Sequence, residues 1–88
     1  MRTNIVFMLT GTDQIGIVEE ATRLMLARGG NVETSRMARL GGCFAMLMLV
    51  SVPADQLAGL EQDAQQLVAR GYQITLTVAE PAEAGAHA

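Results

Sequence analysis

Residues 31–52 read NVETSRMARLGGCFAMLMLVSV, two β-type runs that only Gly41 and Gly42 separate. A two-residue Gly-Gly connection is typical of a tight hairpin, because its turn needs positive φ at both central positions. The pattern therefore predicts strands over 31–40 and 43–52. The turn also fixes their register, with Leu40 opposite Cys43 and one further pair at each step away from the turn.

This register divides the hairpin side chains between two faces. One face carries the pairs Leu40–Cys43, Ala38–Ala45, Arg36–Leu47 and Thr34–Leu49, continued by Val32. The other carries the pairs Arg39–Phe44, Met37–Met46, Ser35–Met48 and Glu33–Val50. We expect the first face to be covered by helices, which would leave Phe44, Met46, Met48 and Val50 on an open face that another sheet or chain covers.

The rest of the chain completes an alternating pattern of strands and helices. Residues 3–10 are apolar at both alternating sets of positions, as in a central strand. Apolar residues then recur at helical spacing from Ile17 to Arg28, until Gly29 and Gly30 end the helix. Pro53 is expected in the first turn of a second helix that Gly71 ends, and residues 72–79 alternate as a last strand.

The resulting order, βαββαβ, predicts the fold class. It is typical of a ferredoxin-like α+β sandwich, with a four-stranded antiparallel sheet and two helices on one face. Strands one and three should be central. We expect one domain over residues 1–79, followed by a disordered tail over 80–88 that holds the only histidine, His87.

Composition argues against several functions. The 88 residues carry a net charge of −3 and three aromatic side chains, whereas nucleic-acid binders usually have a basic stripe and stacking aromatics. No run approaches the roughly 20 apolar residues of a membrane span, and no signal peptide is visible. We expect a cytoplasmic protein that binds neither nucleic acid directly nor membrane.

Catalysis and metal binding are also disfavoured. The lone Cys43 excludes an internal disulfide and a cysteine metal cluster, and we interpret it as a small core residue. Ser35 and Ser51 have no histidine partner within the folded part, so no nucleophile–base pair can be assembled. The sequence predicts no enzyme activity, no cofactor and no metal.

The segment GTDQIG (residues 11–16) has the outline of a phosphate loop, since it lies between a strand and a helix. A nucleotide P-loop needs Lys and Ser/Thr directly after its last glycine. Ile17 and Val18 occupy those positions, and Asp13 adds a negative charge. Phosphate is therefore not the expected ligand.

Several motifs resemble an ACT domain, and in particular the glycine cleavage system transcriptional repressor branch of that family. They are Asp13-x-x-Gly16-Ile17-Val18, Gly30-Asn31-Val32, and Ser35-Arg36-Met37-Ala38 leading through Leu40-Gly41-Gly42 to Phe44 and Met46-Leu47-Met48. The resemblance implies a regulatory domain that binds an amino acid or another small metabolite. It acts on an attached enzyme or a partner protein.

The resemblance also implies a ligand site where the first loop meets the start of the second strand, usually across a subunit interface. By position, its residues are Gly11, Asp13, Gln14, Ile15, Gly16, Asn31 and Val32. The sequence departs from the family twice. Ile15 stands where proline is common, and the repressor branch usually has two such domains where this sequence has one. A shared site then implies a homo-oligomer, a dimer or tetramer.

Each of these residues has a structural reading beside the functional one. Asp13 could receive an ammonium group or only cap the helix. Gly16 could let the backbone approach a carboxylate or only allow close packing of helix on sheet. Asn31 could contact a ligand or only ease the turn after Gly30, and we interpret Arg36 and Arg39 as ordinary ion-pair residues.

Two functions remain open. The first is a sensor of a small amino acid such as glycine or serine, with a transcription regulator as partner. The second is an interaction module that works without any ligand.

Overall fold

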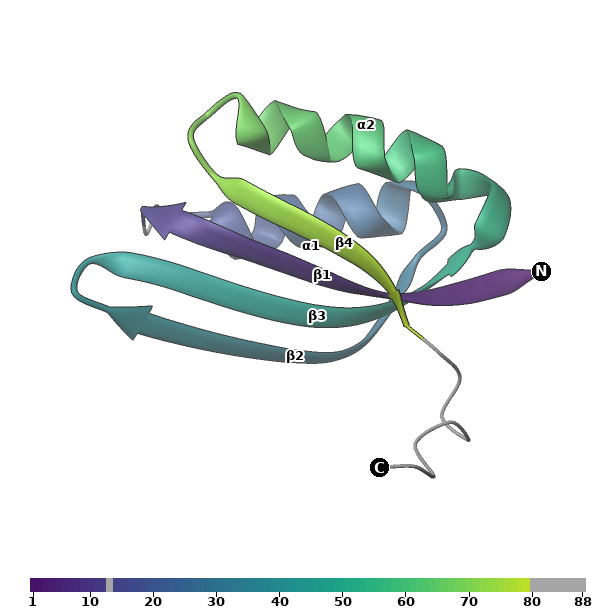
Figure 1. Ribbon diagram of the computed structural model, residues 1–88, viewed down its shortest axis with the longest axis horizontal. Helices are drawn as coiled ribbons and strands as arrows, with labels where there is room; N and C mark the ends of the chain where they lie inside the picture. Colours follow the sequence, from purple (N-terminus) through teal and green to yellow (C-terminus); the bar gives the residue numbers. More distant parts are fainter. Residues whose placement is uncertain (13, 80–88) are drawn as a thin grey trace.

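The computed structural model describes residues 1–12 and 14–79. In chain order the elements are β1 (Arg2–Thr12), α1 (Ile17–Ala27), β2 (Asn31–Leu40), β3 (Cys43–Pro53), a short 3₁₀ turn (Ala54–Gln56), α2 (Leu57–Val68) and β4 (Gln73–Ala79). The strands form one antiparallel sheet in the order β2-β3-β1-β4, so that strands one and three are central (Figure 1). The predicted ferredoxin-like α+β sandwich is confirmed. The tail predicted for residues 80–88 lies outside the described residues.

The β2–β3 hairpin has the predicted turn. Gly41 and Gly42 have φ values of 58° and 85°, as a primed two-residue turn requires. The predicted register is confirmed from Leu40–Cys43 back to Thr34–Leu49. The predicted Glu33–Val50 pair is wrong, because a β-bulge at this point makes Val32 the partner of Val50.

The prediction of which sheet face is covered is wrong. Phe44, Met46, Met48 and Val50 are buried in the core, each at most 2% exposed. They share a face with Phe7 and Leu9 of β1, through the pairs Phe7–Met48 and Leu9–Met46. Both helices pack on that face, and Leu47 on the other face is 42% exposed.

The reason for the error is physical. Both alternating sets of β3 are apolar, so the strand pattern alone does not say which set the helices cover. The apolar side chains that recur at helical spacing along α1 and α2 cover one face of the sheet. They are Ile17, Ala21 and Met25 of α1 and Leu60, Ala64 and Leu67 of α2. Each large side chain buried this way contributes roughly 1.5–3 kcal/mol.

Glycines end α1 as predicted, whereas α2 begins later than predicted. Gly29 has φ 77°, and the Gly30 amide donates to the Met25 carbonyl oxygen at 2.9 Å, which satisfies the last turn of α1. Pro53 does not lie in the first turn of α2. It is the last residue of β3, with extended backbone at φ −57° and ψ 134°, and the 3₁₀ turn precedes the helix.

A partly buried ion pair joins the C-terminal end of α1 to α2. Arg28 donates from Nε and Nη2 to the two oxygens of Asp63, at 2.8 and 3.2 Å, and from Nη1 to Gln56 Oε1 at 3.2 Å. This hydrogen bond raises the pKa of Arg28 and lowers the pKa of Asp63. A Cβ at Gly59 would lie 2.4 Å from Arg28 Nη1, so the guanidinium occupies the space that this glycine leaves.

Candidate functional site

The connection between β1 and α1 borders a pocket of about 380 Å³ on the helix side of the sheet. Gly11 and Thr12 are the last residues of β1, so the connection itself is shorter than the GTDQIG segment suggests. The pocket is lined by Gln14, Ile15, Gly16, Ile17, Val18, Glu19 and Arg39. Three of the residues predicted from the sequence, Gln14, Ile15 and Gly16, therefore lie together in one pocket.

The N-terminus of α1 opens onto this pocket. Gly16 has φ 86°, a left-handed conformation that disfavours other residues, and its carbonyl oxygen accepts from the Glu20 amide at 2.9 Å. A Cβ at Gly16 would meet no atom within 4 Å, so the close-packing reading of this glycine is wrong. The amides of a first helical turn carry partial positive charge, which favours an anionic group.

Arg39 of β2 also lines the pocket. From the sequence alone, Arg39 was expected to be an ordinary ion-pair residue. Its guanidinium carbon lies 5.4 Å from the centre of the Phe44 ring, a cation–π distance. The register already put Arg39 on the same face as Phe44. Because that face was expected to be the open one, the sequence did not reveal that Arg39 faces the helix side.

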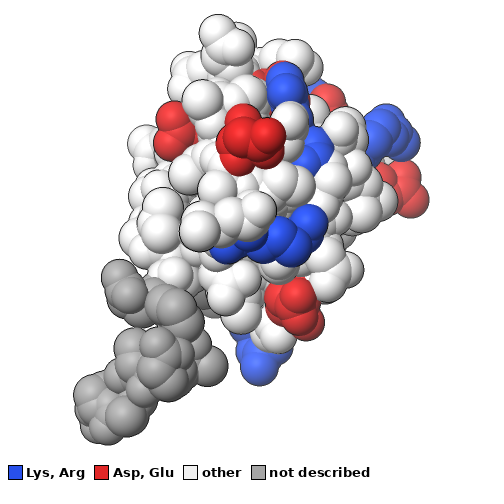
Figure 2. Space-filling view, turned by 90° about the vertical axis from the view of Figure 1, so that its right-hand side faces the viewer, with Lys and Arg blue, Asp and Glu red and all other residues white. Residues whose placement is uncertain are grey.

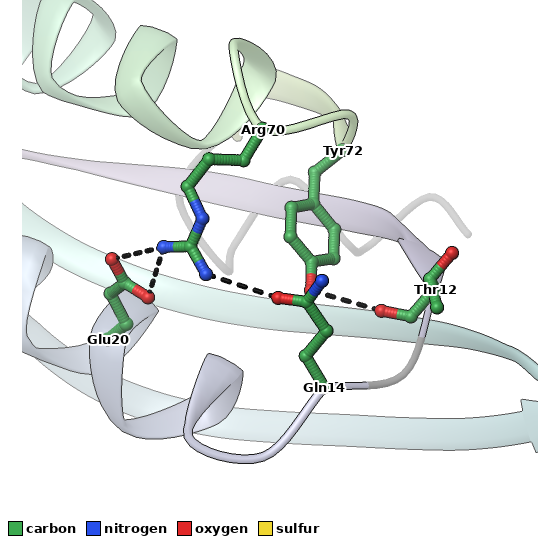
Figure 3. A network of polar contacts seen from close by, with 5 residues as sticks. All are labelled: Thr12, Gln14, Glu20, Arg70 and Tyr72. Carbon is green, nitrogen blue, oxygen red and sulfur yellow. Dashed lines mark hydrogen bonds and ion pairs between the residues drawn. The ribbon is translucent and has the colours of Figure 1, made fainter.

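Gln14 is held in position by Arg70, which follows the C-terminal end of α2. Its Oε1 accepts from Arg70 Nη2 at 3.2 Å, and Arg70 Nη1 pairs with both carboxylate oxygens of Glu20, at 2.5 and 2.6 Å. Figure 3 shows the Arg70 guanidinium between Glu20 and Gln14. The hydrogen bond to Glu20 raises the pKa of Arg70. This network ties the end of α2 to the beginning of α1 and to the loop.

Gly11 is not among the residues that line the pocket, and the glycine at this position has a structural explanation. The Tyr72 ring covers it, and a Cβ at Gly11 would lie 2.5 Å from Tyr72 Cδ1. The Tyr72 hydroxyl donates to the Thr12 carbonyl oxygen at 3.0 Å (Figure 3). Only glycine lets the ring approach β1 so closely.

Asn31 and Val32 lie at the other end of the sheet. Asn31 pairs with Ser51, which pairs with Asn4, whereas the loop follows Thr12. The eight residue-to-residue steps from Asn4 to Thr12 span about 26 Å of strand. Asn31 is exposed and its Nδ2 donates to Glu33 Oε2 at 2.9 Å, while Val32 packs against the core. A single chain therefore does not bring these two residues to the pocket, and Asp13 lies outside the described residues.

Charge on the end of the molecule that carries Asn31 is mixed. Figure 2, which faces the end where β1 begins, shows basic and acidic side chains interspersed rather than gathered by sign.

Within residues 1–12 and 14–79, no group of three His, Cys, Asp or Glu side chains is arranged to hold a metal ion. No helix in the described part of the chain is long and apolar enough to cross a membrane. Cys43, expected in the core, is exposed.

The fold and the helix-side pocket define a small ferredoxin-like domain with a pocket beside the N-terminus of α1. A family comparison identifies the class more closely, since residues 3–78 match the ACT domain family. The chain belongs to the ACT domain family, whose members are small-molecule-binding regulatory domains. The resemblance seen in the sequence is thus confirmed.

Solved structures agree with this assignment. A Galdieria sulphuraria protein without a known function is 37% identical, with a TM-score of 0.78 over 92% of this chain and 47% of its own. A protein provisionally assigned as a glycine cleavage system transcriptional repressor is 28% identical, with a TM-score of 0.85 over 92% of this chain and 48% of its own. The chain thus spans about half the length of these two proteins. No curated protein matches the sequence significantly.

The same fold also occurs within enzymes. A formyltetrahydrofolate deformylase from Burkholderia mallei has a TM-score of 0.77 over 90% of this chain and 30% of its own, at 16% identity. At that identity the likeness shows the fold alone.

Proposed function

We propose that this ACT domain is a regulatory sensor of a small amino acid such as glycine or serine. It acts through oligomerisation and through a partner protein rather than by catalysis. The observation that carries the proposal is the pocket beside the N-terminus of α1, in which Glu19 and Arg39 supply charges of opposite sign.

The pocket chemistry fits an amino-acid zwitterion. A carboxylate can accept hydrogen bonds from the Arg39 guanidinium and from amides of the first turn of α1. An ammonium group can donate to Glu19 and to Gln14 Oε1. Glycine and serine have no large side chain, so they suit a site whose polar groups converge on the two charged ends.

A second chain completes the proposed site. Asn31 and Val32 lie about 26 Å along the sheet from the loop, so they can reach the pocket only from another copy. Ligand binding would then stabilise the oligomer, because a ligand that contacts both chains binds only the associated form.

The proposed partner is a transcription regulator that acts on genes of glycine cleavage or amino-acid metabolism. This part of the proposal is supported by the 28% identity to the repressor described above. Association with the regulator would differ between the ligand-bound and ligand-free oligomers.

Isothermal titration of the folded chain with each of the standard amino acids tests the proposal. We expect saturable binding of a small amino acid and a Kd raised at least about tenfold by Arg39→Gln, since charge-assisted hydrogen bonds contribute about 1.5–3 kcal/mol. Arg36→Gln is the matched control, because Arg36 lies on the same strand but on the other face. Its Kd should stay within about twofold.

Two results would contradict the sensor. One is the absence of a response to any amino acid by a folded, oligomeric chain. The other is an equal effect of the Arg36 and Arg39 substitutions. Asn31→Ala and Asp13→Ala extend the test, since a loss of ligand response with the fold intact supports sensing.

The second candidate is an interaction module that works without ligand. It is favoured by the structural reasons found for two of the predicted site residues, Gly11 and Gln14. Tyr72 explains why residue 11 is glycine, and the Arg70 side chain explains the position of Gln14. Under this alternative, Asn31→Ala and Asp13→Ala affect folding or nothing.

A further inference from the structure

The turn between α2 and β4, residues 69–72, contacts the β1–α1 connection at two points. Tyr72 donates from its hydroxyl to the Thr12 carbonyl oxygen at 3.0 Å, and Arg70 donates from Nη2 to Gln14 Oε1 at 3.2 Å. Figure 3 shows both side chains reaching the connection from the end of α2. The paired residues are 60 and 56 positions apart in the sequence, so these contacts depend on the tertiary fold.

The turn that carries Arg70 and Tyr72 is held by contacts of its own. The amides of these two residues both donate to the Leu67 carbonyl oxygen, at 3.0 and 3.2 Å, which closes the last turn of α2. Tyr72 is 3% exposed, and its ring lies against Gly11. The two side chains therefore reach the β1–α1 connection from a turn that is anchored to both α2 and β1.

Arg70 joins the connection to the first turns of α1. Its Nη1 pairs with both carboxylate oxygens of Glu20, while its Nη2 donates to Gln14. The amide oxygen of Gln14 is thus turned towards Arg70, and it keeps a second lone pair for another donor. A mobile glutamine side chain loses rotamer freedom when it binds a ligand, so a side chain that is already fixed binds with a smaller loss of entropy.

A second arginine provides a comparison. The Arg28–Asp63 pair also links α1 to α2, and its side chains are 32% and 23% exposed, against 43% and 39% in the Arg70–Glu20 pair. Ion pairs as exposed as the second contribute little to stability. The two arginines differ in their further partners. Arg28 bonds to Gln56 at the start of α2, whereas Arg70 bonds to Gln14, which lines the pocket.

We propose that Arg70 and Tyr72 are positioning residues for the amino-acid pocket. Tyr72 fixes the end of β1 and Arg70 fixes Gln14, so that the pocket has its binding conformation before an amino acid arrives. The inference rests on the proposed function, because it concerns the same pocket. Coupling between two sites is reciprocal, so an amino acid that contacts Gln14 also stabilises the turn after α2. This turn is therefore where the rest of the protein responds to binding.

Isothermal titration with each of the standard amino acids separates positioning from stability. We expect Arg70→Gln to raise the Kd about tenfold and to lower the melting temperature by at most about 5 °C. Arg28→Gln is the matched control, since it removes the other arginine that links α1 to α2. It should lower the melting temperature at least as much and leave the Kd within about twofold. Equal effects of the two substitutions on the Kd would overturn the proposal.

A double-mutant cycle tests whether Arg70 acts through Gln14. In a Gln14→Ala background, Arg70→Gln should change the Kd by less than about twofold, because the side chain that Arg70 positions is gone. A tenfold effect that persists there would overturn the proposal.

Tyr72→Phe tests the other contact. It removes the hydrogen bond to Thr12 but keeps the ring over Gly11. We expect the Kd to rise about threefold to tenfold, since the end of β1 is then less firmly held. An unchanged Kd would overturn the role of Tyr72.

Amide hydrogen exchange measures the reciprocal effect. The amino acid that binds most tightly in the titration should, at saturation, slow exchange of the Arg70 and Tyr72 amides at least about threefold more than that of the Gly30 amide at the other end of α1. Arg70→Gln should abolish this difference, and Arg28→Gln should preserve it. Equal slowing of all three amides in the wild type would overturn the coupling.

The titration also distinguishes failure of this inference from failure of the proposed function. A wild type that binds no standard amino acid would overturn both. A wild type that binds one, with the same Kd in Arg70→Gln as in Arg28→Gln, would overturn the positioning role alone.

Discussion

The two faces of the sheet are nearly equally apolar along β3, yet helices cover only one of them. Phe44, Met46, Met48 and Val50 are buried, whereas Leu47 between them is 42% exposed. The difference shows that the apolar pattern of β3 indicates that both faces of the strand can be buried. The pattern does not indicate which face the helices of the same chain cover. That choice is made by β1 and by the helices that follow it.

The largest expected effect separates neighbouring residues of β3. Met46→Ala should lower the free energy of unfolding by about 2–5 kcal/mol, because it leaves a cavity in a well-packed core. Leu47→Ala, on the face away from the helices, should cost about 1 kcal/mol or less in the monomer. Urea denaturation at low protein concentration measures both. Equal losses would contradict the assignment of the covered face.

A smaller effect is expected at the end of β1. Gly11→Ala should destabilise the fold by about 1–3 kcal/mol, because the new methyl group would lie 2.5 Å from Tyr72 Cδ1. Thr10→Ala, which precedes it on the side away from the helices, is the control and should cost less. The penalty at Gly11 should shrink in a Tyr72→Leu background. An unchanged penalty there would refute the contact with the ring as its cause.

The smallest effect concerns the ion pair in the helix layer. Because Arg28 lowers the pKa of Asp63, this carboxylate stabilises the fold at pH values above its ordinary pKa. That stability is lost as the pH falls below about 4 and through the lowered value. The difference in unfolding free energy between wild type and Asp63→Asn should therefore be constant from pH 7 to 5 and should narrow towards pH 3.

Denaturant titrations at several pH values measure this difference. Arg28 stays charged throughout, since its pKa is raised. A difference that is the same at pH 7 and pH 3 would mean that the ionised carboxylate of Asp63 does not stabilise the fold.

The candidate site could be predicted only in part, because some of its residues come together only through contacts between elements distant in sequence. The glycine spacing predicted a loop before a helix, and Gln14, Ile15 and Gly16 do line the pocket. The sequence did not indicate Arg39 as a site residue, because Arg39 lies on a strand distant in sequence and on the sheet face that was expected to be open. Asn31 and Val32 follow from family resemblance, and a single chain holds them at the other end of the sheet.

The sequence by itself determined the local elements of this ACT domain. Gly41 and Gly42 specify a tight turn and a register, Gly29 and Gly30 end α1, and the spacing of apolar residues defines both helices. These features depend on φ preferences and periodicity, which act over a few residues. Only the tertiary structure decided which face of β3 is buried and that Arg39 lines the same pocket as the N-terminus of α1. Both depend on contacts between elements far apart in the chain, and the local pattern allows either outcome.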